Sequence, residues 1–188
     1  MRAPLSQFLD EVAAETRTPG GGAAAGVTLA IAAGLLAMAA RFSRTEWEDA
    51  PGIVAQAEAL RDRVAALAAE NDAAYAAASR ALAGETSARG RDAGIAVALS
   101  GAVAVLLQIA EAASDVAELG AVVVDCGHPA FRADAVSATL LAEASARIAA
   151  NLVEINLGVT PEDERLERVR SLAELTSRAS ARARASAE

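Results

Sequence analysis

Long alanine-rich runs, separated by proline and glycine, constrain the fold of this chain more than any other feature. Two of the runs carry no charge at all, from Ala23 to Ala40 and from Ala93 to Ala110. Alanine has the highest helix propensity of all residues, whereas strands favour β-branched and aromatic side chains. Aromatic residues make up only 3% of this chain. We therefore predict an all-α protein whose helices approach one another closely, with little bulk between them.

Proline and glycine indicate where each helix begins and ends. Proline is tolerated at the first turn of a helix, and glycine is common just after the last. The resulting prediction is six helices, at about Leu5–Thr16, Gly21–Ser43, Pro51–Ala83, Ser87–Asp125 with a break at Gly120, Pro129–Leu157 and Pro161–Ala187. In the last, Thr160, Pro161 and Asp163 stand in the order of a capping box. A length of 188 residues suits one domain, 1–188, so we expect a single bundle of long antiparallel helices.

The charges and the single cysteine limit which binding partners and which cellular compartment we expect. The net charge is -8, which disfavours binding along a nucleic acid. Cys126 has no partner for an internal disulfide, and no zinc-type spacing of cysteine and histidine occurs, so we expect a reducing compartment and no metal. No targeting signal opens the chain, and we predict a cytoplasmic protein. The uncharged runs contain Thr28, Ser100 and Gln108, which favours buried core helices over membrane spans.

A glycine-rich segment is the most unusual local feature. It reads Thr18-Pro-Gly-Gly-Gly-Ala-Ala-Ala-Gly26, at the expected start of the second helix. Glycine within a helix costs about 1 kcal/mol relative to alanine, so this segment must need backbone without side chains. Two needs are equally plausible here. Another helix packs closely against it, or its exposed N–H groups receive a ligand at the positive end of the helix dipole.

Two polar residues fall on apolar faces of predicted helices. In the third helix, apolar residues recur at alternating spacings of four and three, and Asn71 lies inside this seam. Asp72 is expected to point away from the seam, and Tyr75 to lie one turn beyond Asn71 on the same side. Asn71 is then either a buried residue that fixes the helix register or a site residue. Asp134 lies on the apolar side of the fifth helix and must be paired with an arginine or belong to a site.

The only histidine stands in the loop that leads into the fifth helix. His128 follows Gly127 and precedes both Arg132 and Asp134. Imidazole titrates near neutral pH, so His128 is a candidate for proton transfer, with a purely structural role as the alternative. Cys126, in the same loop, has no base beside it in sequence and is expected to be a small buried residue.

Taken in order along the chain, these segments resemble the cyclodeaminase/cyclohydrolase family. This family includes the C-terminal domain of formiminotransferase-cyclodeaminase and bacterial methenyltetrahydrofolate cyclohydrolases. The resemblance covers nearly the whole chain. It is carried by Phe8-Leu-Asp-Glu-Val, Thr18-Pro-Gly-Gly-Gly-Ala-Ala-Ala, the helix with Asn71 to Tyr75, the loop from Gly127 to Asp134, and Val153-Glu-Ile-Asn-Leu157.

The resemblance implies a fold, an assembly and a chemistry. The fold would be all-α, and the protein a homodimer with a folate site in a cleft near the dimer interface. Family members eliminate ammonia from 5-formiminotetrahydrofolate while closing the ring to 5,10-methenyltetrahydrofolate, or hydrolyse the methenyl compound to 10-formyltetrahydrofolate. Both reactions need proton transfer but no metal or bound cofactor. The resemblance assigns substrate binding or catalysis to Pro19, Gly20, Gly21, Gly22, Arg132, Asp134 and Asn156.

Several family positions carry different residues in this chain. The acidic residue thought to be catalytic falls on Asn71, with Asp72 one position away, and an asparagine of the family falls on Leu152, beside Asn151. Arg41, Arg44 and Trp47 replace the usual lysines, and we include the two arginines and Asn151 among the candidate substrate-binding residues. An amide does not act as an acid or base. We therefore expect His128 to replace the missing group, with Asp72 as the weaker choice.

Three functions are compatible with this sequence. The first is an enzyme that makes or breaks a C–N bond at an amidine-type carbon of a tetrahydrofolate derivative. The second is a diverged relative that cyclises a different small molecule through an imine or amidine. The third is a catalytically silent dimer that binds a ligand.

Overall fold

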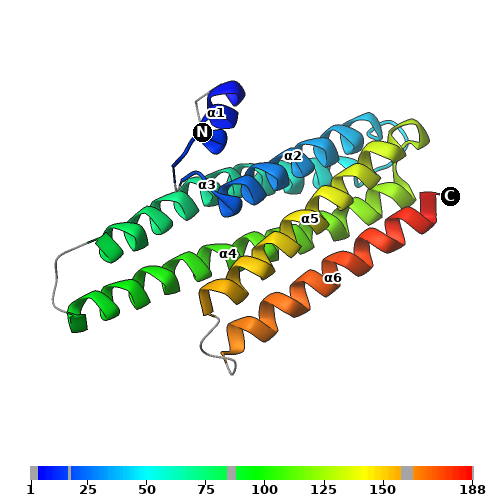
Figure 1. The fold of residues 1–188 in the computed structure, drawn as a ribbon. Helices are drawn as coiled ribbons and strands as arrows, with labels where there is room; N and C mark the ends of the chain where they lie inside the picture. Colours follow the sequence, from blue (N-terminus) through cyan, green and yellow to red (C-terminus); the bar gives the residue numbers. More distant parts are fainter. Residues whose placement is uncertain (1–3, 17, 84–87, 158–162, 188) are drawn as a thin grey trace.

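The fold consists of helices only, in the part of the chain that can be described. The computed structural model describes residues 4–16, 18–83, 88–157 and 163–187 (Figure 1). The helices are α1 (Leu5–Ala13), α2 (Gly21–Phe42), α3 (Ala50–Ala83), α4 (Ala88–Cys126), α5 (Arg132–Leu157) and α6 (Glu164–Ala187), with a short 3-10 helix, η1 (Pro129–Phe131), before α5. The all-α prediction and the order of the six helices are confirmed.

Two predicted boundaries were wrong. α4 runs without a break through Gly120. Gly120 is glycine because α5 passes close by: a Cβ on it would lie 2.5 Å from Cγ2 of Thr139. α6 begins at Glu164 rather than at Pro161, and Oδ1 of Asp163 accepts the N–H of Arg165 at 2.9 Å, as a helix cap does. The predicted cap at Thr160 and Pro161 lies outside the described residues.

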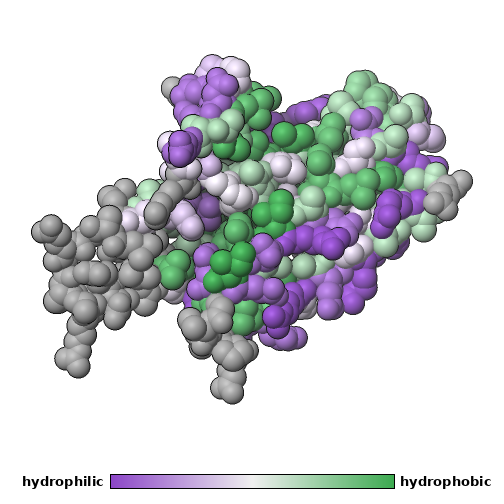
Figure 2. Space-filling view, in the orientation of Figure 1, coloured by the Kyte–Doolittle hydropathy of each residue, from purple (hydrophilic) through white to green (hydrophobic). Residues whose placement is uncertain are grey.

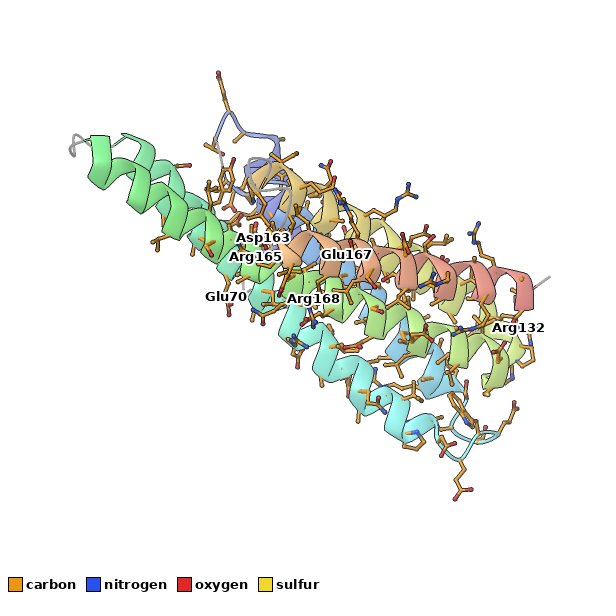
Figure 3. The ribbon with its side chains drawn as sticks, turned by 90° about the horizontal axis from the view of Figure 1, so that it is seen from below. Glu70, Arg132, Asp163, Arg165, Glu167 and Arg168 are labelled. Carbon is orange, nitrogen blue, oxygen red and sulfur yellow. The ribbon has the colours of Figure 1, made fainter. Side chains whose placement is uncertain are left out.

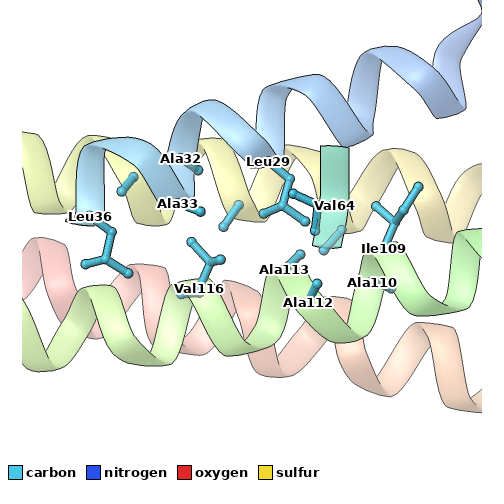
Figure 4. Packing of buried hydrophobic residues seen from close by; sticks show 14 of the residues in the cluster. Leu29, Ala32, Ala33, Leu36, Val64, Ile109, Ala110, Ala112, Ala113 and Val116 are labelled. Atoms are coloured by element: carbon cyan, nitrogen blue, oxygen red, sulfur yellow. The ribbon is translucent and has the colours of Figure 1, made fainter. Parts of the chain in front are cut away.

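The helices pack closely with few large side chains between them, as the alanine-rich sequence predicts. α2 packs against α3, α4 and α5, and α6 covers α4 and α5 from the other side (Figure 1). The centre is filled by a few large side chains, such as Leu29, Leu36 and Ile109, between layers of alanine (Figure 4). The helices are so close that a Cβ on Gly26 of α2 would lie 2.8 Å from the Cβ of Ala68 in α3.

α2 and residues Leu99–Cys126 of α4 are long and apolar enough to span a membrane, by length and composition alone. In the bundle, 56% and 44% of these two windows are buried inside the protein. Both are therefore accounted for as core helices.

Cys126, at the end of α4, is exposed, so the prediction of a buried cysteine was wrong.

α1 stands apart from the bundle. It projects above the start of α2 and buries only Phe8 (Figure 1). Its other apolar side chains, Leu5, Leu9 and Val12, are exposed. A nine-residue helix is too short to be stable in water by its own hydrogen bonds, so its apolar face has to be covered for the helix to persist.

Charged residues hold α6 on its neighbours. Arg168 pairs with Glu111 of α4, Arg182 with Glu118 of α4 at 2.7 Å, and Arg170 with Glu154 of α5 at 2.8 Å. Each pair is at least partly exposed and contributes little to stability by itself. Together they fix the orientation of a helix whose surface is otherwise strongly polar.

Candidate functional site

A cavity of about 140 Å³ lies at the end of the bundle where α2 begins. Its walls come from the glycine-rich segment, the second half of α3, the middle of α4 and the end of α5. The lining residues are Thr18, Gly20, Gly21, Gly22, Asn71, Asp72, Tyr75, Leu106, Leu152 and Asn156. The antiparallel order of the helices brings these segments together, because the first residues of α2 lie beside the last turn of α5.

Close packing explains two glycines of this segment, Gly22 and Gly26. Asn71 is buried, with 7% of its surface exposed, and a Cβ on Gly22 would lie 2.0 Å from its Oδ1. The amide of Asn71 thus fills the space that the missing side chain leaves. Gly21, by contrast, is exposed at the cavity, where a Cβ would be in ordinary contact with Leu152 at 3.6 Å. The sequence left open whether these glycines serve close helix packing or ligand contact. Gly22 and Gly26 serve close packing, while Gly20 and Gly21 leave backbone exposed at the cavity.

Asp72, the weaker catalytic candidate of the sequence analysis, lines the cavity, although the seam of α3 predicted that it points away. Its carboxylate is half-buried beside the backbone of Gly20. Burial raises the pKa of Asp72 above its usual value; the N–H of Gly20 acts in the opposite direction, and the charge of Glu11 raises the pKa further. The side chain reaches the cavity although the α3 seam points elsewhere, because the facing glycines have no side chains to exclude it.

Three further lining residues extend this site. Asn156 faces the cavity from the end of α5, in agreement with its predicted place. Leu152 also lines it, whereas the exposed Asn151 is not among the lining residues, and its predicted role in substrate binding stays a prediction. Tyr75 stands at the mouth with 42% of its surface exposed. Tyr75 was not predicted as a site residue, although its spacing of one helical turn from Asn71 was the signal that places it there.

His128 lies at the opposite end of the bundle. Its backbone N–H donates to Oγ of the buried Ser43 at 2.8 Å, and its Nδ1 accepts the N–H of Ala130 at 3.1 Å. Its Nε2 lies 3.7 Å from a carboxylate oxygen of Glu46. The ring thereby caps η1 and holds the two loops at this end together, which is the structural role that the sequence analysis gave as the alternative.

Four other predicted residues share this end with His128. Arg41 pairs with Glu58, Arg44 is exposed, and Asp134 lies in the first turn of α5, where the helix dipole favours a carboxylate. Arg132 is half-buried, and its Nε has no hydrogen-bond partner among the described residues. In Figure 3, Arg132 lies near one end of the bundle, and Glu70, the neighbour of Asn71, lies far from it along the bundle.

The predicted site residues therefore form two groups within one chain. α2 begins at Gly21 and Ser43 follows its end, a separation of about 30 Å at 1.5 Å per residue. Within one subunit, Asn71 therefore lies far from His128 and Asp134. No group of three or more histidine, cysteine, aspartate or glutamate side chains suited to a metal ion occurs among the described residues.

The fold and the site together define an all-α antiparallel bundle with a small, partly polar cavity between its helices. Comparison with protein families makes this more specific. The chain belongs to the formiminotransferase-cyclodeaminase family, whose profile matches residues 4–174.

A solved structure supports this assignment. The chain is similar to the formiminotetrahydrofolate cyclodeaminase from Thermotoga maritima, with 25% identity and a TM-score of 0.89. The similarity covers 98% of this chain and 96% of that one. The comparison with curated proteins gives no match.

Proposed function

We propose that this protein is an enzyme that makes or breaks a C–N bond at the amidine-type carbon of a tetrahydrofolate derivative. Its substrate would be 5-formiminotetrahydrofolate or 5,10-methenyltetrahydrofolate. The family assignment and the similarity to the Thermotoga maritima cyclodeaminase support this class of substrate. The observation that carries the proposal is that Asp72, the glycine-rich segment and Asn156 line one cavity.

Both reactions require a group that holds and releases a proton. In cyclisation, the secondary amine nitrogen outside the pteridine ring bonds to the formimino carbon and loses its proton. The bond from that carbon to the imino nitrogen breaks, and the imino nitrogen takes up a proton and leaves as ammonia. In hydrolysis, water gives up a proton as its oxygen bonds to the methenyl carbon, and the bond from that carbon to the pteridine ring nitrogen then breaks as this nitrogen takes up a proton. A carboxyl group whose pKa is raised by burial serves both directions better than a fully solvated one. Asp72 is such a group, since burial raises its pKa.

The remaining cavity residues would bind and orient the substrate. The amide of Asn71, packed against Gly22, offers a fixed donor and acceptor in place of a titrating carboxyl group. Tyr75 presents an aromatic surface at the mouth, suited to a flat conjugated ring. Exposed backbone at Gly20 and Gly21 allows close approach of the ligand. In this assignment Asp72, rather than His128, replaces the acidic residue of the family.

The direct test is to mix the purified protein with each folate substrate and follow the absorbance of the methenyl compound. We expect its formation from 5-formiminotetrahydrofolate or its loss by hydrolysis to exceed the rate in buffer by several orders of magnitude. No acceleration with either substrate would refute the proposal.

One observation favours a second candidate, a silent ligand-binding protein. Asn71 occupies the position of the family's acidic residue, and an amide does not titrate. The same samples distinguish the two. Calorimetric binding of a folate without turnover would establish the silent function, whereas turnover would exclude it. In either case we propose a cytoplasmic protein that carries no bound cofactor and no metal.

A further inference from the structure

The first N–H groups of α2 have no acceptor among the described residues. In an α-helix, the N–H groups of the first turn lack a helical carbonyl four residues before them. The first such bond of α2 runs from the N–H of Ala24 to the carbonyl of Gly20 at 3.0 Å, and no side chain caps the helix. The N–H groups of Gly21, Gly22 and Ala23 are therefore unpaired in the described part of the chain, and the last two residues are buried. A buried N–H group without an acceptor is costly, so a ligand oxygen is the partner we expect.

The side chain of Asn71 faces the same place. Only 7% of its surface is exposed, and its amide forms no hydrogen bond with any residue that the structure describes. The amide lies against the first turn of α2, because a Cβ on Gly22 would be 2.0 Å from Oδ1 and 2.8 Å from Nδ2. Asn71 also lines the cavity. Buried side-chain amides are nearly always hydrogen-bonded, so an unpaired amide at a cavity indicates a polar group of a ligand.

The start of α2 carries a partial positive charge that its own side chains do not neutralise. The aligned peptide dipoles of a helix are equivalent to about +0.5 of an elementary charge at its N-terminus. α2 has no acidic residue in its first turn and no charged residue from 21 to 40. In Figure 2, the atoms along α2 and the adjoining part of α5 are green and white. The cavity therefore attracts an oxygen atom that carries negative charge.

The neighbouring carboxylates decide which kind of oxygen this is. Asp72 lines the same cavity beside Gly20, and Glu11 of α1 is close enough to raise the pKa of Asp72. A phosphate or carboxylate ligand would be repelled by both residues, and the half charge of the helix dipole would not outweigh them. A carbonyl oxygen avoids this repulsion, because it has a partial negative charge but belongs to a group without net charge.

The size and walls of the cavity indicate the group that carries this oxygen. Its volume of about 140 Å³ is smaller than the roughly 300–1,000 Å³ of pockets that enclose a whole drug-sized molecule. The cavity therefore admits one ring system and leaves the rest of a larger ligand outside. Leu106 and Leu152 supply apolar walls, and Tyr75 supplies an aromatic surface at the mouth. A flat ring with a carbonyl oxygen on its edge matches these features.

We propose that the first turn of α2 and the amide of Asn71 form a site for the ring carbonyl oxygen of a pteridine. We call it the carbonyl site; its donors are the N–H groups of Gly21, Gly22 and Ala23 and the amide of Asn71. The choice of a pteridine rests on the proposed function, whereas the preference for a carbonyl oxygen does not.

The carbonyl site would orient the substrate for proton transfer. In a 5-substituted tetrahydrofolate, the ring carbonyl is next to the ring nitrogen that bears the one-carbon group. Asp72 lies beside Gly20, which directly precedes the first donor of the carbonyl site. A pteridine whose carbonyl oxygen is bound at the start of α2 therefore holds its one-carbon group toward Asp72. Such positioning of the reacting atoms is a large part of what an enzyme contributes to the rate.

Gly21→Pro removes one donor of the carbonyl site at a position that tolerates proline. Gly21 is the first residue of α2, where proline is common, and Gly20 before it is extended, with φ -121° and ψ -160°. A Cβ on Gly21 would be in ordinary contact with Leu152 at 3.6 Å. Gly21→Ala adds the same Cβ and keeps the N–H group. The difference between these two variants therefore measures the N–H group, once circular dichroism has shown equal helix content.

Two pteridines that differ only at the carbonyl serve as probes. 2-Amino-4-oxopteridine has the carbonyl oxygen, and 2,4-diaminopteridine has an amino group, a donor, in its place. In titration calorimetry at pH 7, wild type should bind the oxo compound about tenfold more tightly than the diamino compound. Gly21→Pro should bind the oxo compound about tenfold more weakly than Gly21→Ala does. Absence of binding of the oxo compound to wild type, equal affinities of wild type for the two probes, or equal affinities of the two variants for the oxo compound would overturn the proposal.

A second pair of variants tests the side-chain donor. Asn71→Leu removes the amide at similar volume and should weaken binding of the oxo compound by about tenfold. The matched control is Gln56→Leu, which removes an exposed amide of the same helix in the groove between α3 and α4. It should bind the oxo compound as wild type does. Equal affinities of Asn71→Leu and Gln56→Leu would show that Asn71 is not part of the carbonyl site.

Turnover separates this proposal from the proposed function. Preference for the oxo compound in wild type, lost in Gly21→Pro, would refute only the proposed function if neither folate is turned over. Turnover with equal affinity for the two pteridines would overturn only the carbonyl site. In an active protein, Gly21→Pro should raise KM by about tenfold relative to Gly21→Ala, because the ring carbonyl is bound before the chemical step. A lower kcat with unchanged KM would mean that the N–H groups bind an oxygen formed during the reaction, which contradicts the proposal.

Discussion

Replacing Gly26 with alanine tests the close packing on which the fold depends. The new Cβ would lie 2.8 Å from the Cβ, 3.1 Å from the Cα and 3.3 Å from the N of Ala68. Two of these three atoms are backbone, so no side-chain rotation relieves the contact and α2 must move away from α3. Overpacking of this kind costs about 1–3 kcal/mol, and we place Gly26→Ala at the upper end. The gain in helix propensity, about 1 kcal/mol, offsets part of this, leaving a net loss of about 2 kcal/mol.

The matched control is Gly101→Ala in α4, where the new Cβ meets nothing within 4 Å. Here only the propensity gain remains, and we expect about 0.5–1 kcal/mol of added stability. Urea unfolding followed by far-UV circular dichroism, at one protein concentration for all variants, measures both changes. In thermal unfolding, Tm should fall by about 4–8 °C for Gly26→Ala and rise by a few degrees for the control. A Gly26→Ala variant as stable as wild type would refute the close-packing argument.

Further expectations concern the cavity and the start of α6. Gly22→Ala should displace the buried amide of Asn71 and lower turnover by about 100-fold while the helix content stays intact; unchanged kinetics would contradict the packing of these two residues. Because burial raises the pKa of Asp72, its ionised form destabilises the fold. Asp72→Asn should therefore be more stable than wild type at pH 7. The difference in stability between the two proteins should vanish as the pH falls below 3.8. Arg165 lowers the pKa of Asp163 to about 2. The ionised Asp163 therefore stabilises the fold above pH 3.8, and this stabilisation is lost as the pH falls through about 2. In Arg165→Ala, the urea midpoint of unfolding should depend less on pH between these two values.

Local sequence signals predicted the helices well because they arise within a few residues. Proline and glycine placed the ends of α2, α3 and α5 to within three residues, since their backbone preferences act at the position itself. Gly120 was misread for a related reason. A glycine that ends a helix and one that admits a neighbouring helix look the same in sequence, and only the contact with Thr139 shows which applies.

The site was predicted less well because it depends on which helix ends lie together. Asn71 was correctly placed in the α3 seam, but the seam describes one face only and gave no sign that glycines opposite Asp72 leave room for its carboxylate. The topology did hold a usable signal. In an up-and-down bundle the start of α2 meets the end of α5, so Gly20 belongs with Asn156, while His128 at the start of α5 belongs at the other end.

The central claim is that Asp72 performs the proton transfer in the cavity, and the turnover number of Asp72→Asn tests it most directly. The control is Asp115→Asn in the groove between α3 and α4, since burial also raises the pKa of Asp115 and the residues that line this groove differ from those of the cavity. With 5-formiminotetrahydrofolate as substrate, kcat should fall by about 100- to 10,000-fold for Asp72→Asn and stay at the wild-type value for Asp115→Asn. A kcat for Asp72→Asn equal to that of wild type would contradict the account.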